Sequence, residues 1–195
     1  MLSNEPIKNM VDYCVQYDIC FTGNGAEAEF IKGRKVKGET LVHLLWKLIP
    51  AVYQQMAGKN DRTWDLTACY LKEELSERIS TDAFWVGYLN NTVSEPLSSD
   101  KRISVSAVIA DEDHIDLVFT STIGLSGKDY LEGISVLVWK TYTSLLEEDQ
   151  TMGLWLKQSL KDLVQKESFW DSEPVSDEET DSLRTEFYNT NRRFS

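Results

Sequence analysis

Hydrophobic and polar residues alternate in two segments near the N-terminus, residues 13–21 and residues 26–36. A period of two is typical of strands with one buried face. The residues between them, Thr-Gly-Asn-Gly at 22–25, form a turn signal rich in glycine and asparagine. We therefore predict that the two segments form a β-hairpin.

The pattern changes to a helical period from Glu39 onward. Apolar residues then recur at steps of three and four, which is typical of an amphipathic helix packed on a sheet. They are Leu41, Leu44, Leu45, Ile49, Val52 and Tyr53. Pro50 lies within this run, and we expect it to kink or shorten the helix because proline has no backbone N–H to donate.

The middle of the chain gives less regular signals. Residues 64–71 are predicted to form a strand, which the charged residues 72–80 follow. One of Ser80, Thr81 and Asp82 then suits the N-cap of a helix over residues 83–91.

The clearest strand pattern lies in residues 102–110 and 115–122, which alternate on either side of the polar residues 111–114. Two alternating segments joined by a short polar turn predict neighbouring antiparallel strands.

Two more helices are predicted, over residues 129–148 and residues 152–166. The β-branched residues within 134–139 would also suit a strand, but we favour a helix because the apolar pattern is long. We find no internal repeat in the sequence.

Together these elements predict a single α+β domain over residues 1–170. It would contain a curved, mostly antiparallel sheet with helices packed on one face. Beyond Trp170 the composition is too polar and acidic to bury a face, so we expect residues 171–195 to be a mobile acidic tail.

Composition adds limits on location and cofactors. Of the 195 residues, 42% are hydrophobic and 27% are charged, as in ordinary globular proteins. The three cysteines, Cys14, Cys20 and Cys69, lack the spacing of a zinc site, and the apolar stretches are too short to span a bilayer. We therefore expect a cytoplasmic protein with no signal peptide, no membrane partner, no metal and no cofactor.

The net charge of −12 changes the picture of possible partners. An acidic excess repels a phosphate backbone and favours basic protein surfaces, although it also keeps a protein in solution. One function hypothesis is therefore an acidic, non-enzymatic interaction protein, such as an inhibitor or adaptor, that covers a basic partner surface.

Catalytic chemistry has little support in the sequence. It contains no phosphate-binding Walker loop, no GxSxG and no HExxH motif. Glu73, Glu74 and Glu77 share a helical spacing, but their neighbours Lys72 and Arg78 favour a solvated helix face. We therefore expect a binding protein and not an enzyme.

Aromatic residues offer a different chemistry, because the chain contains six Trp, seven Phe and eight Tyr. A flat cation can stack on an indole ring with a carboxylate beside it. Trp64 followed by Asp65 is the best local candidate for such a pair, although we favour the simpler interpretation that Trp64 opens a strand and packs inward. Trp46, Trp85 and Trp139 lie within apolar runs and are interpreted as core or partner-facing residues.

Several short motifs follow one another in a fixed order along the chain. They are Trp64, Asp-Ala-Phe-Trp at 82–85, Ala-Val-Ile at 107–109, Asp-His-Ile at 113–115, Val-Trp-Lys at 138–140 and Asn-Arg-Arg-Phe at 191–194. This order resembles the cap-binding translation initiation factor 4E family, mainly over residues 40–140.

The resemblance implies a translation factor that binds the methylated guanine cap of mRNA between two aromatic rings. The family has a tryptophan in its first loop, whereas this chain has only Phe21 and Phe30 nearby. The second ring and its acceptor would be Trp64 with Asp65, or Tyr53 with Gln54.

The family also holds the cap phosphates with basic residues of its later hairpin. Here residues 111–114 are acidic and would repel phosphate, so Lys101, Arg102 or Lys128 would have to take this role.

The resemblance further implies a scaffold partner that presents a helix, like initiation factor 4G. Residues 40–46 are similar to the family's first helix, so Val42, Leu45 and Trp46 would form the surface that contacts this partner. The first function hypothesis is accordingly a divergent factor 4E-like protein that binds capped mRNA and such a scaffold.

Overall fold

The computed structural model of the protein describes residues 12–22, 25–87, 100–109 and 114–171. The elements follow the order β1 (Cys14–Thr22), β2 (Gly25–Lys32), α2 (Gly38–Ala57), α3 (Arg62–Ser80), α4 (Asp82–Val86), β3 (Arg102–Ile109), β4 (Ile115–Ser121), α5 (Gly127–Glu148), α6 (Gln150–Leu163) and α7 (Glu167–Asp171). Among the described residues no helix is both long and apolar enough to cross a membrane.

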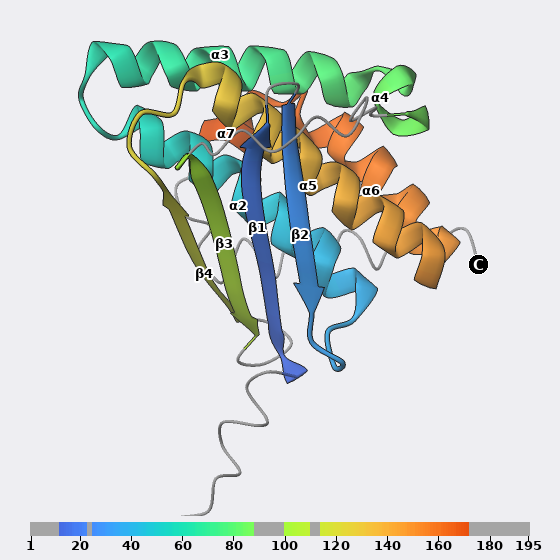
Figure 1. The fold of residues 1–195 in the computed structure, drawn as a ribbon. Helices are drawn as coiled ribbons and strands as arrows, with labels where there is room; N and C mark the ends of the chain where they lie inside the picture. The colour runs from blue at the N-terminus through green and yellow to red at the C-terminus, as the bar shows by residue number, and fades with distance from the viewer. Residues whose placement is uncertain (1–11, 23–24, 88–99, 110–113, 172–195) are drawn as a thin grey trace, which may run out of the picture.

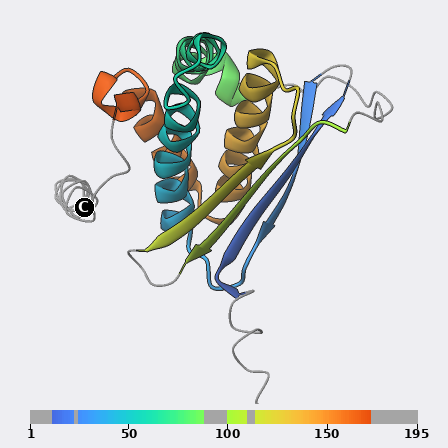
Figure 2. The same cartoon turned by 90° about the vertical axis from the view of Figure 1, so that its left-hand side faces the viewer.

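The four strands form one sheet in the order β2-β1-β3-β4, and all neighbours are antiparallel. The described helices pack on one face of this sheet, as Figures 1 and 2 show from two directions. The α+β class, the antiparallel sheet and its one-sided helical layer are therefore confirmed.

The core lies between the sheet and the helices. Alternate residues of the central strands, such as Tyr17 and Ile19 of β1 and Val105 of β3, point into it. The Tyr17 hydroxyl lies 2.7 Å from Oγ1 of Thr141 in α5, so its polar atom is satisfied where water is excluded. Burial raises the pKa of Tyr17, which stays protonated.

Both predicted hairpins and the helices over 129–148 and 152–166 are confirmed, with small differences at their ends. The predicted helix from Glu39 onward is also confirmed, and it runs through Pro50 to Ala57. Proline therefore did not shorten it.

The predicted strand over residues 64–71 is wrong, because these residues are helical and belong to α3. Asp61 caps this helix by accepting hydrogen bonds from the amides of Thr63 and Trp64. The buried side chains of α3 recur at helical spacing and are Ala68, Leu71, Leu75 and Ile79. The burial pattern has a period near 3.6 and not two.

Two other predictions fall partly outside the described residues. The helix expected over residues 83–91 is α4 in its first part, which ends at Val86, and residues 88–91 are not described. Of the expected tail over residues 171–195, only Asp171 is described, and it ends α7.

The prediction that the chain has no repeat is corrected at the level of structure. The series β-β-α-α-α occurs twice, first as β1 to α4 and then as β3 to α7. Asp149 caps α6 as Asp61 caps α3, through the amides of Thr151 and Met152. Each half also ends in a short helix with a buried Phe-Trp pair. The repeat is invisible in the sequence because the two halves share a pattern of burial and few identities.

Candidate interaction surface

The face of the sheet turned away from the helices is a polar surface to which all four strands contribute. We call it the open face, since no described helix covers it in Figure 2. Alternation along each strand places every second residue on it. These residues are Cys14, Gln16, Asp18, Cys20, Glu27, Glu29, Ile31, Arg102, Ser104, Ser106, Val108, Asp116, Val118 and Thr120.

Antiparallel register arranges the open face in rows that cross the strands. One row runs from Glu29 through Asp18 and Ser104 to Thr120. Asp18 and Glu29 are thus direct cross-strand neighbours, a position in which side chains lie about 5 Å apart. Two carboxylates this close repel each other and destabilise the sheet.

Asp18 is held in place by neutral donors. It accepts hydrogen bonds from Oγ of Ser104 at 2.9 Å and from Nε2 of Gln16 at 3.0 Å. These bonds orient the carboxylate but bring no positive charge to it. The repulsion between the Asp18 and Glu29 carboxylates is therefore relieved only by solvent or by a positive charge from a partner.

The remaining charges on the open face are Glu27, Asp116 and Arg102. With Asp18 and Glu29, four carboxylates face one guanidinium, which leaves the surface with three net negative charges. Its centre carries small polar side chains, Ser104 and Ser106. The open face is consequently acidic and suited to contact with cations.

The sequence pattern contains a signal for this surface. Acidic residues alternate with alanine in residues 26–29, and Gln16 and Asp18 alternate with the apolar residues of β1. This pattern places carboxylates on the face opposite the core. The pairing of Asp18 with Glu29 could not be foreseen without the hairpin register.

The aromatic residues predicted to bind a ligand lie among the helices or on the helix side of the sheet. Trp64 lies in the first turn of α3, half-buried, with its ring edge-on to Tyr130 of α5 at 6.2 Å between centroids. Nζ of Lys59 lies 3.5 Å from the centroid of the Trp64 ring. A face of the indole on which a flat cation could stack is therefore occupied by the chain's own ammonium group. Asp65 follows it on α3 and is exposed.

The other two candidate rings have separate neighbours. Phe30 of β2 stacks on Tyr17 at 4.7 Å, with 14° between the ring planes. Tyr53 of α2 packs edge-on against Trp170 of α7 at 5.5 Å. Since each ring is fixed by a different partner, Trp64, Phe30 and Tyr53 do not form one stacking site.

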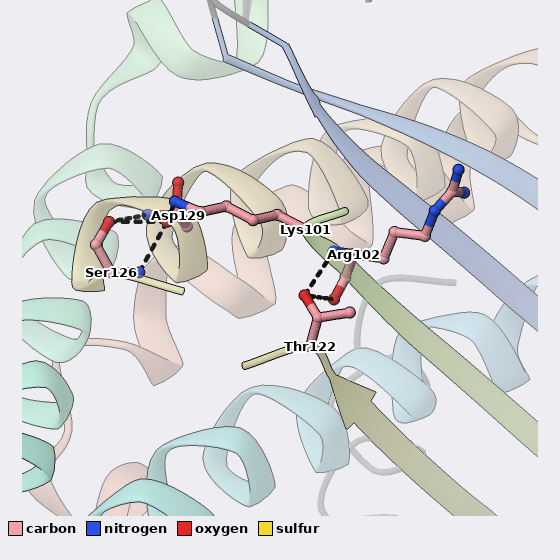
Figure 3. A network of polar contacts seen from close by, with 5 residues as sticks. All are labelled: Lys101, Arg102, Thr122, Ser126 and Asp129. Carbon is pink, nitrogen blue, oxygen red and sulfur yellow. Dashed lines mark hydrogen bonds and ion pairs between the residues drawn. The ribbon is translucent and has the colours of Figure 1, made fainter. Parts of the chain in front are cut away.

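The basic candidates lie near the start of β3 and of α5. Nζ of Lys101 forms an ion pair with Oδ2 of Asp129 at 3.0 Å, and the exposed Lys128 precedes that carboxylate. Figure 3 shows Lys101 reaching toward Asp129 while Arg102 points the other way. Lys101 and Lys128 thus lie at the end of α5 that also contacts Trp64, whereas Arg102 belongs to the open face.

Asp129 is mainly a capping residue of α5. Its side chain accepts from the Ser126 amide at 2.7 Å, and the Ser126 hydroxyl accepts from the Asp129 amide. Burial alone would raise the pKa of Asp129, but the hydrogen bonds from Ser126 and from Lys101 outweigh it and lower the pKa. The ion pair of Asp129 with Lys101 therefore belongs to the capping of α5.

The predicted partner surface on α2 needs correction. Val42 and Leu45 are both 0% exposed, because α2 packs within the layer of helices on the sheet. Trp46 is half-buried, donates from Nε1 to Oγ of Ser159 at 3.1 Å, and lies edge-on to Trp155 of α6 at 5.3 Å. These three side chains join α2 to its neighbours, so they do not present an exposed helix face.

Comparisons with protein-family models, with curated proteins and with solved structures found no match to this chain. Within the described ranges, no group of three or more His, Cys, Asp or Glu side chains is placed to hold a metal ion. The case for function consequently depends on the surface chemistry of the chain itself.

Proposed function

We propose that this protein acts by binding, and that the open face of its sheet covers a basic surface of a partner protein. The observation that carries the proposal is the direct cross-strand placement of Asp18 and Glu29. This arrangement costs stability in the free protein, and a lysine or arginine from a partner would remove the repulsion.

Charge complementarity favours a protein partner over a nucleic acid. The open face carries Glu27, Glu29, Asp18 and Asp116 against Arg102, and the whole chain has a net charge of −12. A phosphate backbone would be repelled by such a surface. An array of lysine and arginine side chains would be attracted to it, and salt would weaken that attraction by screening.

Cap binding, which the family resemblance implies, stays a prediction with less support. None of the described residues on the open face is aromatic, and the candidate rings contact different partners. A titration with a methylated guanine nucleotide, read by tryptophan fluorescence, separates the two functions. Saturable quenching would favour a factor 4E-like protein over our proposal.

The direct test uses a fluorescently labelled peptide of alternating lysine and serine as the probe. The variant Glu27→Gln, Glu29→Gln, Asp116→Asn removes three exposed carboxylates from the open face. We expect it to bind the peptide at least about tenfold more weakly than the wild type in fluorescence anisotropy. We also expect wild-type affinity to fall as salt is added.

A matched control removes the same charge elsewhere. Glu73→Gln, Glu77→Gln and Glu147→Gln change three exposed residues of α3 and α5. This variant should bind within about twofold of the wild type, because its carboxylates lie off the open face. Equal losses in both variants would reduce the effect to net charge and would contradict a defined surface.

A further inference from the structure

The two edges of the sheet differ in how they are protected. β2 forms one edge, and its residues Glu27 and Glu29 lie on the open face. Its Lys32 lies on the helix side of the sheet and pairs with Glu148 of α5. Charged side chains on an edge strand discourage pairing with another strand. The charged side chains of β2 therefore disfavour pairing of this edge with another strand.

β4 is the opposite edge and lacks this protection. Its seven residues include a single charged one, Asp116, and contain no lysine and no proline. Val118 is 58% exposed on the open face, while Leu117 and Phe119 on the helix side are only half-buried. Among the described residues, no strand pairs with the outer side of β4. A hydrophobic, unpaired edge of this kind is a template for a further strand.

The hydrogen-bond pattern fixes which backbone groups β4 offers. The amide of Thr122 donates to the carbonyl oxygen of Arg102 at 3.0 Å, on the β3 side. Bonded pairs alternate along an antiparallel ladder, so the backbone of Val118 also faces β3. The N–H and C=O groups of Leu117 and Phe119 therefore point outward from the sheet.

We infer that the occupant of this edge is a second copy of the chain, paired antiparallel through β4 about a two-fold axis at Val118. In this register Leu117 lies opposite the copy's Phe119, and Asp116 lies opposite the copy's Thr120. All seven residues of β4 take part, and their outward groups would form about eight backbone hydrogen bonds. The strand is thus complementary to itself, as a two-fold interface requires.

Electrostatics distinguishes β4 from β2 for this purpose. Pairing β2 with itself about Ala28 would place Glu27 opposite the copy's Glu29, which repels. In the β4 pair, Asp116 and its copy are separated by about 14 Å, beyond the screening length at physiological salt. Pairing through β4 therefore brings no carboxylates together.

The pairing would make one continuous sheet of eight strands. The two-fold axis stands perpendicular to the sheet, so both helical layers lie on one side and both open faces on the other. This inference does not depend on the proposed function, because self-association and binding of a basic partner are measured separately.

The test is sedimentation equilibrium of the full chain at about 100 μM, where a weak dimer is populated. The weight-average mass of the wild type should exceed the 22.3 kDa of one chain and rise toward twice that value as the concentration is raised. Val118→Lys places two ammonium groups face to face at the axis and should weaken the dimer at least about tenfold. The control Ile31→Lys lies in the same cross-strand row on the other edge, at 55% exposure, and should leave the dimer intact.

A mixture of variants tests the register. Val118→Glu alone should also dissociate the dimer, whereas an equal mixture of Val118→Glu and Val118→Lys should restore it, since opposite charges then meet at the axis. A wild type that stays monomeric would overturn the inference, and would leave the edge to other segments of the chain or to solvent. A dimer that survives Val118→Lys would overturn it as well, since another surface would then hold the copies together.

Discussion

Trp85 and Trp170 make the same hydrogen bond in the two halves of the chain. Nε1 of Trp85 donates to the carbonyl oxygen of Ile79 at 2.7 Å, and Nε1 of Trp170 donates to that of Val164 at 3.0 Å. Each ring also packs edge-on against a tyrosine from the first helix of the other half, Tyr142 for Trp85 and Tyr53 for Trp170. The two halves are thus held together by an exchanged pair of contacts.

Replacing either indole should therefore destabilise the whole domain. We expect Trp85→Phe and Trp170→Phe each to lower the free energy of unfolding by about 2 kcal/mol, because a buried carbonyl loses its donor and the ring shrinks. Urea denaturation followed by circular dichroism measures the loss. Trp139→Phe, at a half-buried ring in the same helical layer, is the control and should cost less. A similar loss of stability in all three variants would contradict a specific contribution of the two indole hydrogen bonds.

Glu29→Gln should stabilise the protein while it weakens binding. Removing one charge of the Asp18–Glu29 pair relieves repulsion across β1 and β2, for a gain of about 0.5 kcal/mol. Glu27→Gln is the matched control, because Glu27 faces Cys20 in the register and should give a smaller gain. Thermal denaturation at low and at high salt measures both. The gain should shrink at high salt, and a loss of stability in Glu29→Gln would contradict the repulsion.

The Asp129 capping box should give a stability difference that depends on pH. The pKa of Asp129 is lowered in the folded protein, so its contribution is present above the ordinary value of about 3.9 and is lost as the pH falls through the lower folded value. Asp129→Asn should be less stable than the wild type by about 1 kcal/mol at neutral pH. Urea denaturation of both proteins from pH 7 downward should show this gap closing in acid. A gap that is constant with pH would contradict the role of the charge.

Lys59→Ala should uncover the face of Trp64. The ammonium group lies 3.5 Å from the ring centroid, so its removal should change the tryptophan emission and cost about 0.5 kcal/mol of stability. Lys35→Ala removes a more distant ammonium group, 5.1 Å from the Tyr13 centroid, and is the control. If the likeness to factor 4E reflects function, Lys59→Ala should also bind a methylated guanine nucleotide more tightly than the wild type. No gain in affinity would count against a stacking role for Trp64.

The sheet was predictable because its signal is local. Alternation extends over most of residues 102–110 and 115–122, which is long enough to indicate strands without knowledge of the rest of the fold. The helix of residues 64–71 was missed because Trp64, Leu66 and Ala68 mimic alternation over a short window. The period becomes clear only when Leu75 and Ile79 are included, and Asp61 is recognised as the cap.

The candidate site was harder to predict because exposure depends on several helices at once. Val42 and Leu45 share the apolar pattern of any amphipathic helix, and the sequence does not say that neighbouring helices and the sheet will enclose them. Trp64 was predicted to stack on a ligand with Asp65 beside it, but the cation over its ring in the structure is the ammonium group of Lys59. The direct placement of Asp18 opposite Glu29 could be predicted only with the register of the first hairpin.

The two halves differ in how closely the first helix of each approaches an edge strand. A Cβ at Gly133 of α5 would lie 2.8 Å from Cδ1 of Ile103, so a larger residue there would force this side chain to move. Counted from the start of each helix, Leu44 takes the corresponding place in α2. α5 contacts β2 extensively, while α2 touches β4 only lightly. Within the described residues, the helical layer therefore covers the β2 edge of the sheet more closely than the β4 edge.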